Sequence, residues 1–354
     1  MSLELDAPNV GELEKRYIND AIDHGFVSTF GPLVAEFEEK FAEYLGVKKA
    51  VSTQSGTAAI HIALHELGIG KGDEVIVPVS TFIATVNPIL YVGARPVFID
   101  VDLNTWNIDV KAIEKNITKR TKAILPVHLY GNPCDMDAII KIAKKNKLFV
   151  IEDATESLGS KYKDRHTGAF GDLGCFSFNG NKTITTGGGG MVAGNDEKRL
   201  EHIKFLANQA REDKGGYYHP EAGFNYRMTN IEAALGLAQM ERLEAFLSKK
   251  RSFTQIYRRE LKDEVSVNFQ ERYGAAEPVP WLNCATFENV KDINLLQSRL
   301  KENGVPTRRV FMPITRFPPY KDFRKYTGAN AEHIYEKGLC LPSSTMNSED
   351  DIQH

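Results

Sequence analysis

Cysteine is scarce in this sequence. Only four cysteines occur among 354 residues, and none belongs to a CxxC pair. Disulfide-stabilised small proteins and structural zinc sites need more thiols at closer spacing. We therefore expect reduced core residues and a cytoplasmic protein. The four stand in mostly apolar surroundings: Cys134, Cys175, Cys284 and Cys340.

The chain also lacks a long hydrophobic run and a strong net charge. No window approaches the roughly 18 uncharged apolar residues of a membrane-spanning helix, and the charged start MSLELDAPNVGELEKR is unlike a signal peptide. The formal net charge is -3, which gives no overall attraction to nucleic acid or to an anionic membrane. We expect no nucleic acid and no membrane among the partners, so any phosphate must be bound locally.

The motifs of several enzyme classes are missing. There is no HxxxH or HExxH spacing, so no metal is expected, and no GxSxG, which disfavours an α/β-hydrolase. A Walker A loop has glycine directly before its lysine, but Asn181 precedes Lys182. The glycine run after this lysine is followed by MVAGND, which resembles a strand and a turn. A dinucleotide-binding helix is therefore not indicated.

Short apolar runs alternate with helical patterns between residues 49 and 153, as in KKAVST before SGTAAIHIALHELGIG. This alternation is typical of an α/β fold with a mainly parallel central sheet covered on both faces. Ligands of such sheets bind beyond the carboxyl ends of the strands. The strand-end residues that we therefore expect near the chemistry are Ser55, Phe82, His128 and Asp153.

Amphipathic patterns predict helices on either side of this region. Two lie before it, at residues 12–25 and 33–46, and a long one begins at Thr229. We predict a large α/β domain of residues 1–240 and a smaller α+β domain of residues 241–354. The final SEDDIQH is a helix start signal with no helix behind it, so the chain looks cut short there.

The segment FSFNGNKTITTGGGGM contains one lysine, Lys182, between an apolar strand and four glycines. A lysine in a loop is usually a solvated charge. The preceding apolar strand, however, would carry the amine towards an interior site, where burial lowers its pKa and frees it as a nucleophile. Four consecutive glycines suggest that the backbone packs tightly against another group.

Two other features complete a possible cofactor site. Asp153, at the end of LFVIED, either caps a helix or holds the protonated nitrogen of a pyridinium ring. Ser55, Gly56 and Thr57 open a helix whose free N–H groups favour an anion such as phosphate. Lysine, carboxylate and phosphate site together fit pyridoxal 5′-phosphate. For His128, Tyr226 and Arg227, structural or surface positions are equally consistent with the sequence.

In order along the chain, these motifs resemble the DegT/DnrJ/EryC1/StrS family of pyridoxal-phosphate-dependent sugar aminotransferases, which have fold type I. The resemblance covers nearly the whole chain: SGTAAIHIAL, STFIAT, RPVFIDVD, HLYGNPCDMD, IEDATESLGS, GDLGCFSFNGNKTITTGGGGM, GFNYRMTNIEAALG and CLPSS. It implies pyridoxal phosphate as cofactor and a homodimer whose active sites are shared across the interface.

The resemblance also implies roles for individual residues. Lys182 is the catalytic lysine, which binds the cofactor covalently and later moves a proton. The implied cofactor-binding residues are Thr57 and the Ala58 amide at the phosphate, Ser177 beside them, Phe82 stacked on the ring, Asp153 at its nitrogen, Glu156, and Asn225 from the neighbouring subunit. Arg227 and Arg309 are candidates for the anionic groups of the substrate. The family often has Gln at position 156 and His at position 315, where this chain has Glu and Thr.

The implied reaction transfers an amino group from L-glutamate to a nucleotide-linked 4-keto-6-deoxy sugar for surface glycans. The run NGNKTITTGGGGM is most similar to that of transaminases making UDP-4-amino-4,6-dideoxy-N-acetylglucosamine. GDP-perosamine synthases and 3-keto sugar aminotransferases are the alternatives. Related dehydratases have histidine in place of Lys182. A non-catalytic regulator that senses the cofactor or a sugar nucleotide represents a different class.

Overall fold

The computed structural model describes residues 3–214, 216–323, 325–326 and 328–354. An eight-stranded sheet with the order β1-β9-β8-β5-β4-β2-β3-β16 lies at its centre. Strand β9 runs antiparallel to both of its neighbours, and the other adjacent pairs are parallel. The strands are β1 (Lys49–Thr53), β9 (Gly190–Gly194), β8 (Leu173–Ser177), β5 (Phe149–Asp153), β4 (Thr121–Ile124), β2 (Glu74–Pro78), β3 (Arg95–Ile99) and β16 (Lys325–Tyr326).

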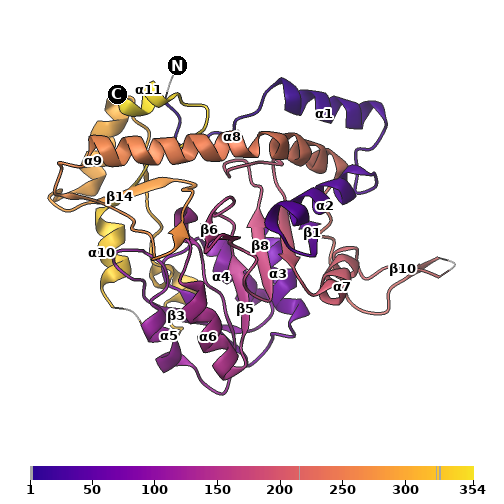
Figure 1. The fold of residues 1–354 in the computed structure, drawn as a ribbon. Coiled ribbons are helices and arrows are strands. Elements are labelled where there is room, and N and C mark those ends of the chain that lie inside the picture. The colour runs from indigo at the N-terminus through magenta and orange to yellow at the C-terminus, as the bar shows by residue number, and fades with distance from the viewer. Residues whose placement is uncertain (1–2, 215, 324, 327) are drawn as a thin grey trace.

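Helices cover both faces of this sheet (Figure 1). In β2, Val75 and Val77 belong to a core cluster with residues of α3, α4 and α7, whereas Ile76 packs with residues of α5 and α6. Because alternate side chains of a strand point to opposite faces, a strand buried on both needs an uninterrupted apolar run. The predicted α/β architecture is therefore confirmed. The helices are α3 (Gly56–Glu66), α4 (Ile83–Tyr91), α5 (Val110–Asn116), α6 (Met136–Asn146) and α7 (Glu197–Ala207).

A 31-residue helix, α8 (Asn230–Glu260), spans the molecule (Figure 1). It starts at a capping box, in which the hydroxyl of Thr229 accepts from the Glu232 amide while the Glu232 carboxylate accepts from the Thr229 amide. The predicted N-terminal helices are α1 (Glu12–Asp23) and α2 (Leu33–Leu45), and both pack on α8. The predicted domain boundary at residues 240 and 241 falls inside α8, and the two-domain division stays a prediction.

The C-terminal part forms a four-stranded antiparallel sheet with the order β12-β14-β17-β15. Its elements are β12 (Val267–Phe269), β14 (Asn283–Phe287), β17 (Gly338–Leu341), β15 (Arg308–Arg309), α9 (Ile293–Glu302) and α10 (Asn330–Lys337). SEDDIQH contains a short helix, α11 (Glu349–Gln353), capped by Ser348. The expectation that no helix follows this start signal was wrong, because Ile352 finds an apolar contact surface with Phe253 and Ile256 of α8.

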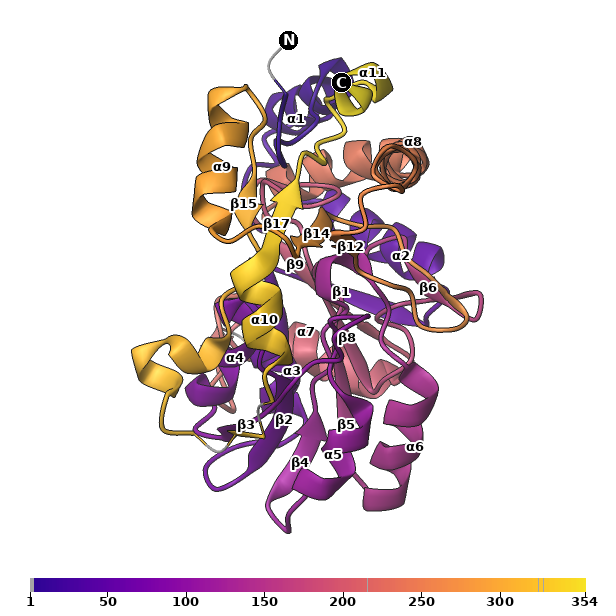
Figure 2. The ribbon, with the colours of Figure 1, turned by 90° about the vertical axis from the view of Figure 1, so that its left-hand side faces the viewer.

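Short elements connect these parts. A three-stranded sheet consists of β13, β6 and β7, and the hairpin of β10 and β11 projects from the body of the molecule (Figure 1). Figure 2, where α8 is seen end-on, shows the N-terminal segment lying near α11 and the C-terminus. The remaining elements are β6 (Lys161–Tyr162), β7 (Arg165–His166), β10 (Glu212–Asp213), β11 (Tyr217–Tyr218), β13 (Ala276–Glu277), η1 (Leu129–Gly131), η2 (Ile314–Arg316) and η3 (Pro318–Tyr320).

Candidate active site

A cavity of about 550 Å³ lies where β5 and β8 end and α3 begins. We call it the central cavity. It contains most of the residues that the sequence singles out. Those that line it are Thr57, Phe82, Asp153, Glu156, Ser177 and Lys182. Ala58 follows Thr57 in the first turn of α3. Segments more than 100 residues apart in the chain therefore meet at one place, as expected for the carboxyl ends of parallel strands.

Lys182 lies in a turn that follows β8, with its side chain only 13% exposed. The Nζ atom is 3.8 Å from Oε1 of Glu156 and 3.8 Å from the centre of the Trp281 ring. Burial lowers the pKa of Lys182, and the carboxylates of Glu156 and Asp153 partly oppose this effect. A lysine in this environment supplies a neutral amine more readily than a solvated one, which is the requirement for a nucleophile.

Asp153 ends β5 and is 2% exposed. Its Oδ2 accepts a hydrogen bond of 2.7 Å from the hydroxyl of Thr85, and its Oδ1 accepts one of 3.1 Å from the amide of Thr155. A turn follows the strand, so Asp153 does not cap a helix. A buried carboxylate that faces a cavity can accept a hydrogen bond from a protonated ring nitrogen.

The start of α3 offers an anion site. The Ser55 hydroxyl caps the helix by accepting from the amide of Ala58 at 3.1 Å, so a phosphate at this amide would replace that bond. A Cβ on Gly56 would lie 2.8 Å from Cβ of Ser177, so only glycine lets the helix start approach β8 this closely. Helix N-terminus, lysine and carboxylate share one cavity. The residues therefore fit a phosphorylated pyridine aldehyde such as pyridoxal phosphate.

The glycine run has two structural functions. Gly188 and Gly189 line the central cavity, whereas a Cβ on Gly190 would lie 2.5 Å from the carbonyl carbon of Ser55. Gly187 is exposed and has open space around it. Close approach therefore explains Gly189, where a Cβ would lie 2.8 Å from Cε of Met228, and Gly190, whereas Gly188 has room for a Cβ. The tight packing expected from four consecutive glycines holds for two of them.

Glu156 is 4% exposed, and its Oε2 accepts from the backbone amide of Tyr130 at 2.8 Å. Burial raises the pKa of Glu156, while the nearby ammonium of Lys182 opposes the rise. Tyr130 also fixes the far wall of the cavity, because its ring stacks on Phe311 with centroids 5.1 Å apart and its hydroxyl accepts from the Phe311 amide.

His128 has a structural position outside the central cavity. It is fully buried, with Nε2 3.0 Å from the carboxylate of Glu152 and Nδ1 accepting from the amide of Cys134. Glu152 also accepts from three backbone amides between Gly168 and Gly171. This histidine therefore links Glu152 of β5 to the segment around Cys134, while Glu152 holds the turn that precedes β8. The structural alternative considered for it is confirmed.

Three other predicted residues do not line the central cavity. Arg227 lines a separate cavity of about 310 Å³, and Asn225 is exposed and bridges to the backbone of Asn208. The guanidinium of Arg309 binds Oδ1 of Asn294 at 2.7 Å and the carbonyl of Tyr335. None of the three reaches Lys182 within one described chain.

Sequence reasoning missed three residues from the C-terminal part that line the central cavity: Trp281, Arg308 and Phe311. Arg308 and Arg309 are neighbours in β15, so their side chains point to opposite sides, and the sequence could not tell which one faces the site. Because the chain has only two tryptophans, Trp281 could have been considered as a site residue from the sequence.

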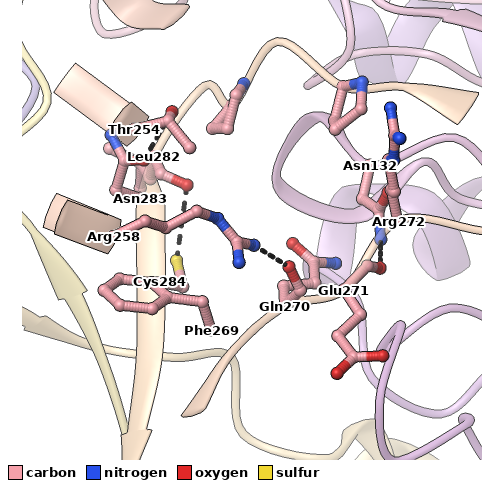
Figure 3. A pocket seen from close by; sticks show the side chains of 12 residues that line it. Asn132, Thr254, Arg258, Phe269, Gln270, Glu271, Arg272, Leu282, Asn283 and Cys284 are labelled. Atoms are coloured by element: carbon pink, nitrogen blue, oxygen red, sulfur yellow. Dashed lines mark hydrogen bonds between the residues drawn. The ribbon is translucent and has the colours of Figure 1, made fainter. Parts of the chain in front are cut away.

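Figure 3 shows the side chains that line a second cavity, of about 540 Å³. We call it the outer cavity. Pro280 and Leu282 line it, whereas Trp281 between them faces the central cavity. Figure 3 shows Arg258 reaching the backbone of Gln270. No residue predicted for the active site lines the outer cavity within the described ranges.

Among the helices in the part of the chain that the structure describes, none combines the length and the apolar character that crossing a membrane requires. The same ranges contain no group of three or more histidine, cysteine and acidic side chains arranged to bind a metal ion.

Known proteins resemble this chain over nearly its full length. The GDP-perosamine synthase of Escherichia coli O157:H7 is 42% identical over 98% of this chain and 94% of its own length. That of Caulobacter vibrioides is 39% identical over 99% and 95%. Among solved structures, the Spr1654 protein of Streptococcus pneumoniae in its PLP form matches with a TM-score of 0.94 at 26% identity, covering 99% of this chain and 96% of that one.

The family model described as the DegT/DnrJ/EryC1/StrS aminotransferase family matches residues 8–354. With the solved PLP form, this match confirms the expected fold type, the aminotransferase class and pyridoxal phosphate as the cofactor. The chain therefore belongs to the DegT/DnrJ/EryC1/StrS aminotransferase family.

Proposed function

We propose that this aminotransferase transfers the amino group of L-glutamate to C4 of a nucleotide-linked 4-keto-6-deoxy sugar. The observation that carries the proposal is the central cavity, in which a buried amine, a buried carboxylate and a helix N-terminus come together. Bound there, pyridoxal phosphate supplies an electron sink for the bond changes at the amino-bearing carbon. The protein supplies the groups that hold it and move protons.

Lys182 binds the cofactor covalently and, once released from it, moves a proton at the carbon that loses or gains the amino group. Asp153 keeps the ring nitrogen protonated, and Glu156 contacts the same cofactor beside Lys182. The phosphate is held at the start of α3 by Thr57 and Ala58 together with Ser177, and Phe82 stacks on the ring. The buried positions of Asp153 and Glu156 and their preorganised hydrogen bonds support these two assignments.

The sugar nucleotide is the finer part of the proposal. The motifs alone favour a UDP-linked 4-keto-6-deoxy-N-acetylglucosamine, whereas relatives 42% and 39% identical to this chain are named GDP-perosamine synthase. This similarity supports the GDP-linked 4-keto-6-deoxymannose, which we therefore propose as the first substrate to test. Position 315, where the family often has histidine, is Thr315 here, so sugar contacts at this position differ from the family pattern.

A homodimer belongs to the proposal because the site is open in one chain. Phe82, at the cavity, is 53% exposed. Phe82 directly precedes α4, and this helix ends at Tyr91. Tyr91 is 59% exposed and packs on His61 of α3. Phe224 extends this aromatic surface. Such a patch favours a protein interface, which would bring Asn225 of a second copy towards the phosphate.

The decisive experiment offers glutamate and one keto sugar at a time. We expect 2-oxoglutarate and an amino sugar nucleotide from GDP-4-keto-6-deoxymannose, and less or none from UDP-4-keto-6-deoxy-N-acetylglucosamine. Lys182→Ala should abolish product and prevent borohydride from fixing the cofactor to the chain. Lys15→Ala, at an exposed position of α1, is the matched control. Amination of only the UDP-linked sugar would overturn the GDP assignment. Binding of both without turnover would favour a regulator.

The shared site can be tested by complementation. If Asn225 acts in the partner's site, each site depends on Lys182 of one chain and on Asn225 of the other. Lys182→Ala and Asn225→Ala therefore each inactivate both sites of their own homodimer. Mixed dimers then contain one site with both residues intact, so about a quarter of all sites should work in a statistical mixture. Recovery of activity after subunit exchange supports the shared site. Equal inactivity before and after exchange, with mixed dimers verified by mass, would contradict it.

A further inference from the structure

The N-terminal segment, residues 3–9, crosses the C-terminal part of the molecule and is tied to it by hydrogen bonds. The carbonyl of Leu5 accepts from the Ser343 amide at 2.7 Å, and the carbonyl of Ala7 accepts from the Ser344 hydroxyl at 2.7 Å. Leu5 also packs against the main core cluster. This segment is therefore part of the folded structure and can position a side chain.

Asp6, in the middle of this segment, reaches the edge of the central cavity. Its Oδ2 accepts from Nη1 of Arg308 at 3.0 Å and from Nδ2 of Asn181 at 2.9 Å. Asn181 directly precedes Lys182, and Arg308 lies in β15 of the C-terminal sheet. One carboxylate thus joins the turn that carries Lys182 to the strand that carries Arg308.

The contact with Asp6 leaves the opposite edge of the Arg308 guanidinium free. The Nε and Nη2 atoms of Arg308 are buried and have no hydrogen-bond partner among the described residues. These two N–H groups form the edge that binds a carboxylate through two parallel hydrogen bonds. Unpaired buried donors are costly, and Arg308 lines the central cavity. A small rotation of its side chain that turns this edge into the cavity would pair both donors with an anionic ligand there.

The guanidinium of Arg308 lies close to the reacting group. Nζ of Lys182 lies 3.8 Å from the centre of the Trp281 ring, and the guanidinium carbon of Arg308 lies 5.6 Å from the same point. A carbon that exchanges a proton with Lys182 must lie beside Nζ. In an amino acid, the α-carboxylate is one bond away from this carbon. A donor placed for reaction therefore brings its α-carboxylate near Arg308.

We propose that Arg308 binds the α-carboxylate of the amino donor and that Asp6 is a positioning residue that orients Arg308 for it. The inference rests on the proposed aminotransferase function. The arginines named from the sequence do not fill this role within one chain, because Arg309 is bound to Asn294 and Tyr335 and Arg227 lies in another cavity.

The experiment follows the first half-reaction alone, in which glutamate converts the protein from its PLP form to its PMP form. The variants are Arg308→Lys, Asp6→Asn and the exposed control Glu12→Gln. The donors are L-glutamate and 4-aminobutanoate, which lacks the α-carboxylate. Calorimetric titration with succinate, a dicarboxylate without an amino group, gives a readout independent of turnover. The KM for the keto sugar is measured in parallel.

We expect Arg308→Lys to raise the half-saturating glutamate concentration about 10- to 100-fold, because a bidentate, charge-assisted contact is lost. Asp6→Asn keeps the shape but loses the charge, so a rise of about 3- to 10-fold is expected. The affinity for succinate should fall in the same order. The half-saturating concentration of 4-aminobutanoate and the KM for the keto sugar should stay within about 2-fold of the wild-type values. Glu12→Gln should match the wild type.

Other results would overturn the inference. An unchanged glutamate dependence in Arg308→Lys excludes Arg308 as the carboxylate-binding residue. Equal losses for glutamate, 4-aminobutanoate and the sugar in Asp6→Asn would show a general structural effect instead of a positioning role. These outcomes require a wild-type protein that reacts with glutamate. A wild type that reacts with no amino donor refutes the proposed function itself, so the two failures are distinguishable.

Discussion

The Nζ atom of Lys182 lies 3.8 Å from the centre of the Trp281 indole ring. The position of this ring is fixed at two points. Its Nε1 donates to the carbonyl of Asn181 at 2.6 Å, and the backbone carbonyl of Trp281 accepts from Nζ of Lys250 at 2.8 Å. The aromatic face favours the ammonium form of Lys182, while burial favours the neutral amine. The reactivity of this lysine therefore depends on both.

Removing the ring should make Lys182 less basic. Because the ring stabilises the ammonium, Trp281→Leu should lower the pKa of Lys182 further. Trp281→Phe keeps an aromatic face and should shift it less. The measurement is the rate at which cofactor-free protein captures pyridoxal phosphate as a function of pH. Its midpoint should move to lower pH in the order wild type, Phe, Leu. An upward shift would contradict the assigned role.

Glu156→Gln should change how stability depends on pH. Burial raises the pKa of Glu156, so the folded state binds the proton more tightly than the unfolded chain does. That contribution to stability is present at low pH and is lost as the pH rises through the folded-state value. Glutamine does not titrate and can still accept from the Tyr130 amide. The variant should therefore gain stability relative to the wild type as the pH rises above about 4, the ordinary value of a glutamate.

Urea unfolding of cofactor-free protein at several pH values measures this difference. The matched control is Glu12→Gln, because the Glu12 side chain is 88% exposed. It should show no such trend. A difference between Glu156→Gln and wild type that is flat across the range, or that falls with pH, would mean that the carboxylate is stabilised as an anion in the folded protein.

The part of the site that is local in sequence was predictable. Lys182 follows an apolar strand, Asp153 ends another, and Ser55 opens a helix, so each was identifiable from a few neighbouring residues. The topology of a parallel sheet then places such strand ends together. The central cavity confirms that these three segments converge.

The part built by distant segments was not predictable. Asp6 and Arg308 are 302 positions apart, and their contact depends on how the N-terminal segment lies across the C-terminal sheet. The choice between Arg308 and Arg309 depends on the register of a two-residue strand, in which a shift of one residue exchanges the faces. No local pattern in the sequence encodes either relationship.

Lys250 should make stability rise with pH under alkaline conditions. Burial lowers the pKa of Lys250 to about 8, while Nζ donates to the carbonyls of Trp281 and Ser343. Between about pH 8 and 10.5 the unfolded chain binds more protons than the folded one, so wild-type stability should rise there by an amount on the order of 3 kcal/mol. Lys250→Met does not titrate. The free energy of unfolding of the wild type minus that of the variant should therefore increase across this range, and a constant difference would refute the shifted pKa.

The glycine run offers a matched pair of substitutions. A Cβ at Gly190 would lie 2.5 Å from the Ser55 carbonyl carbon, so Gly190→Ala must displace the start of α3 at a cost of about 1 to 3 kcal/mol. Gly187→Ala meets no neighbouring atom and has only the strain of its positive φ of 84°, about 1 kcal/mol.

The two variants should also differ in how they bind the cofactor. Displacing Ser55 moves the N–H groups of α3 that we propose hold the phosphate. Gly190→Ala should therefore weaken pyridoxal phosphate binding, while Gly187→Ala should leave the affinity close to the wild-type value. Thermal unfolding gives the stability change, and equilibrium titration of cofactor-free protein gives the affinity. Equal affinities for both variants would mean that the close approach of Gly190 to Ser55 serves packing alone, without a part in phosphate binding.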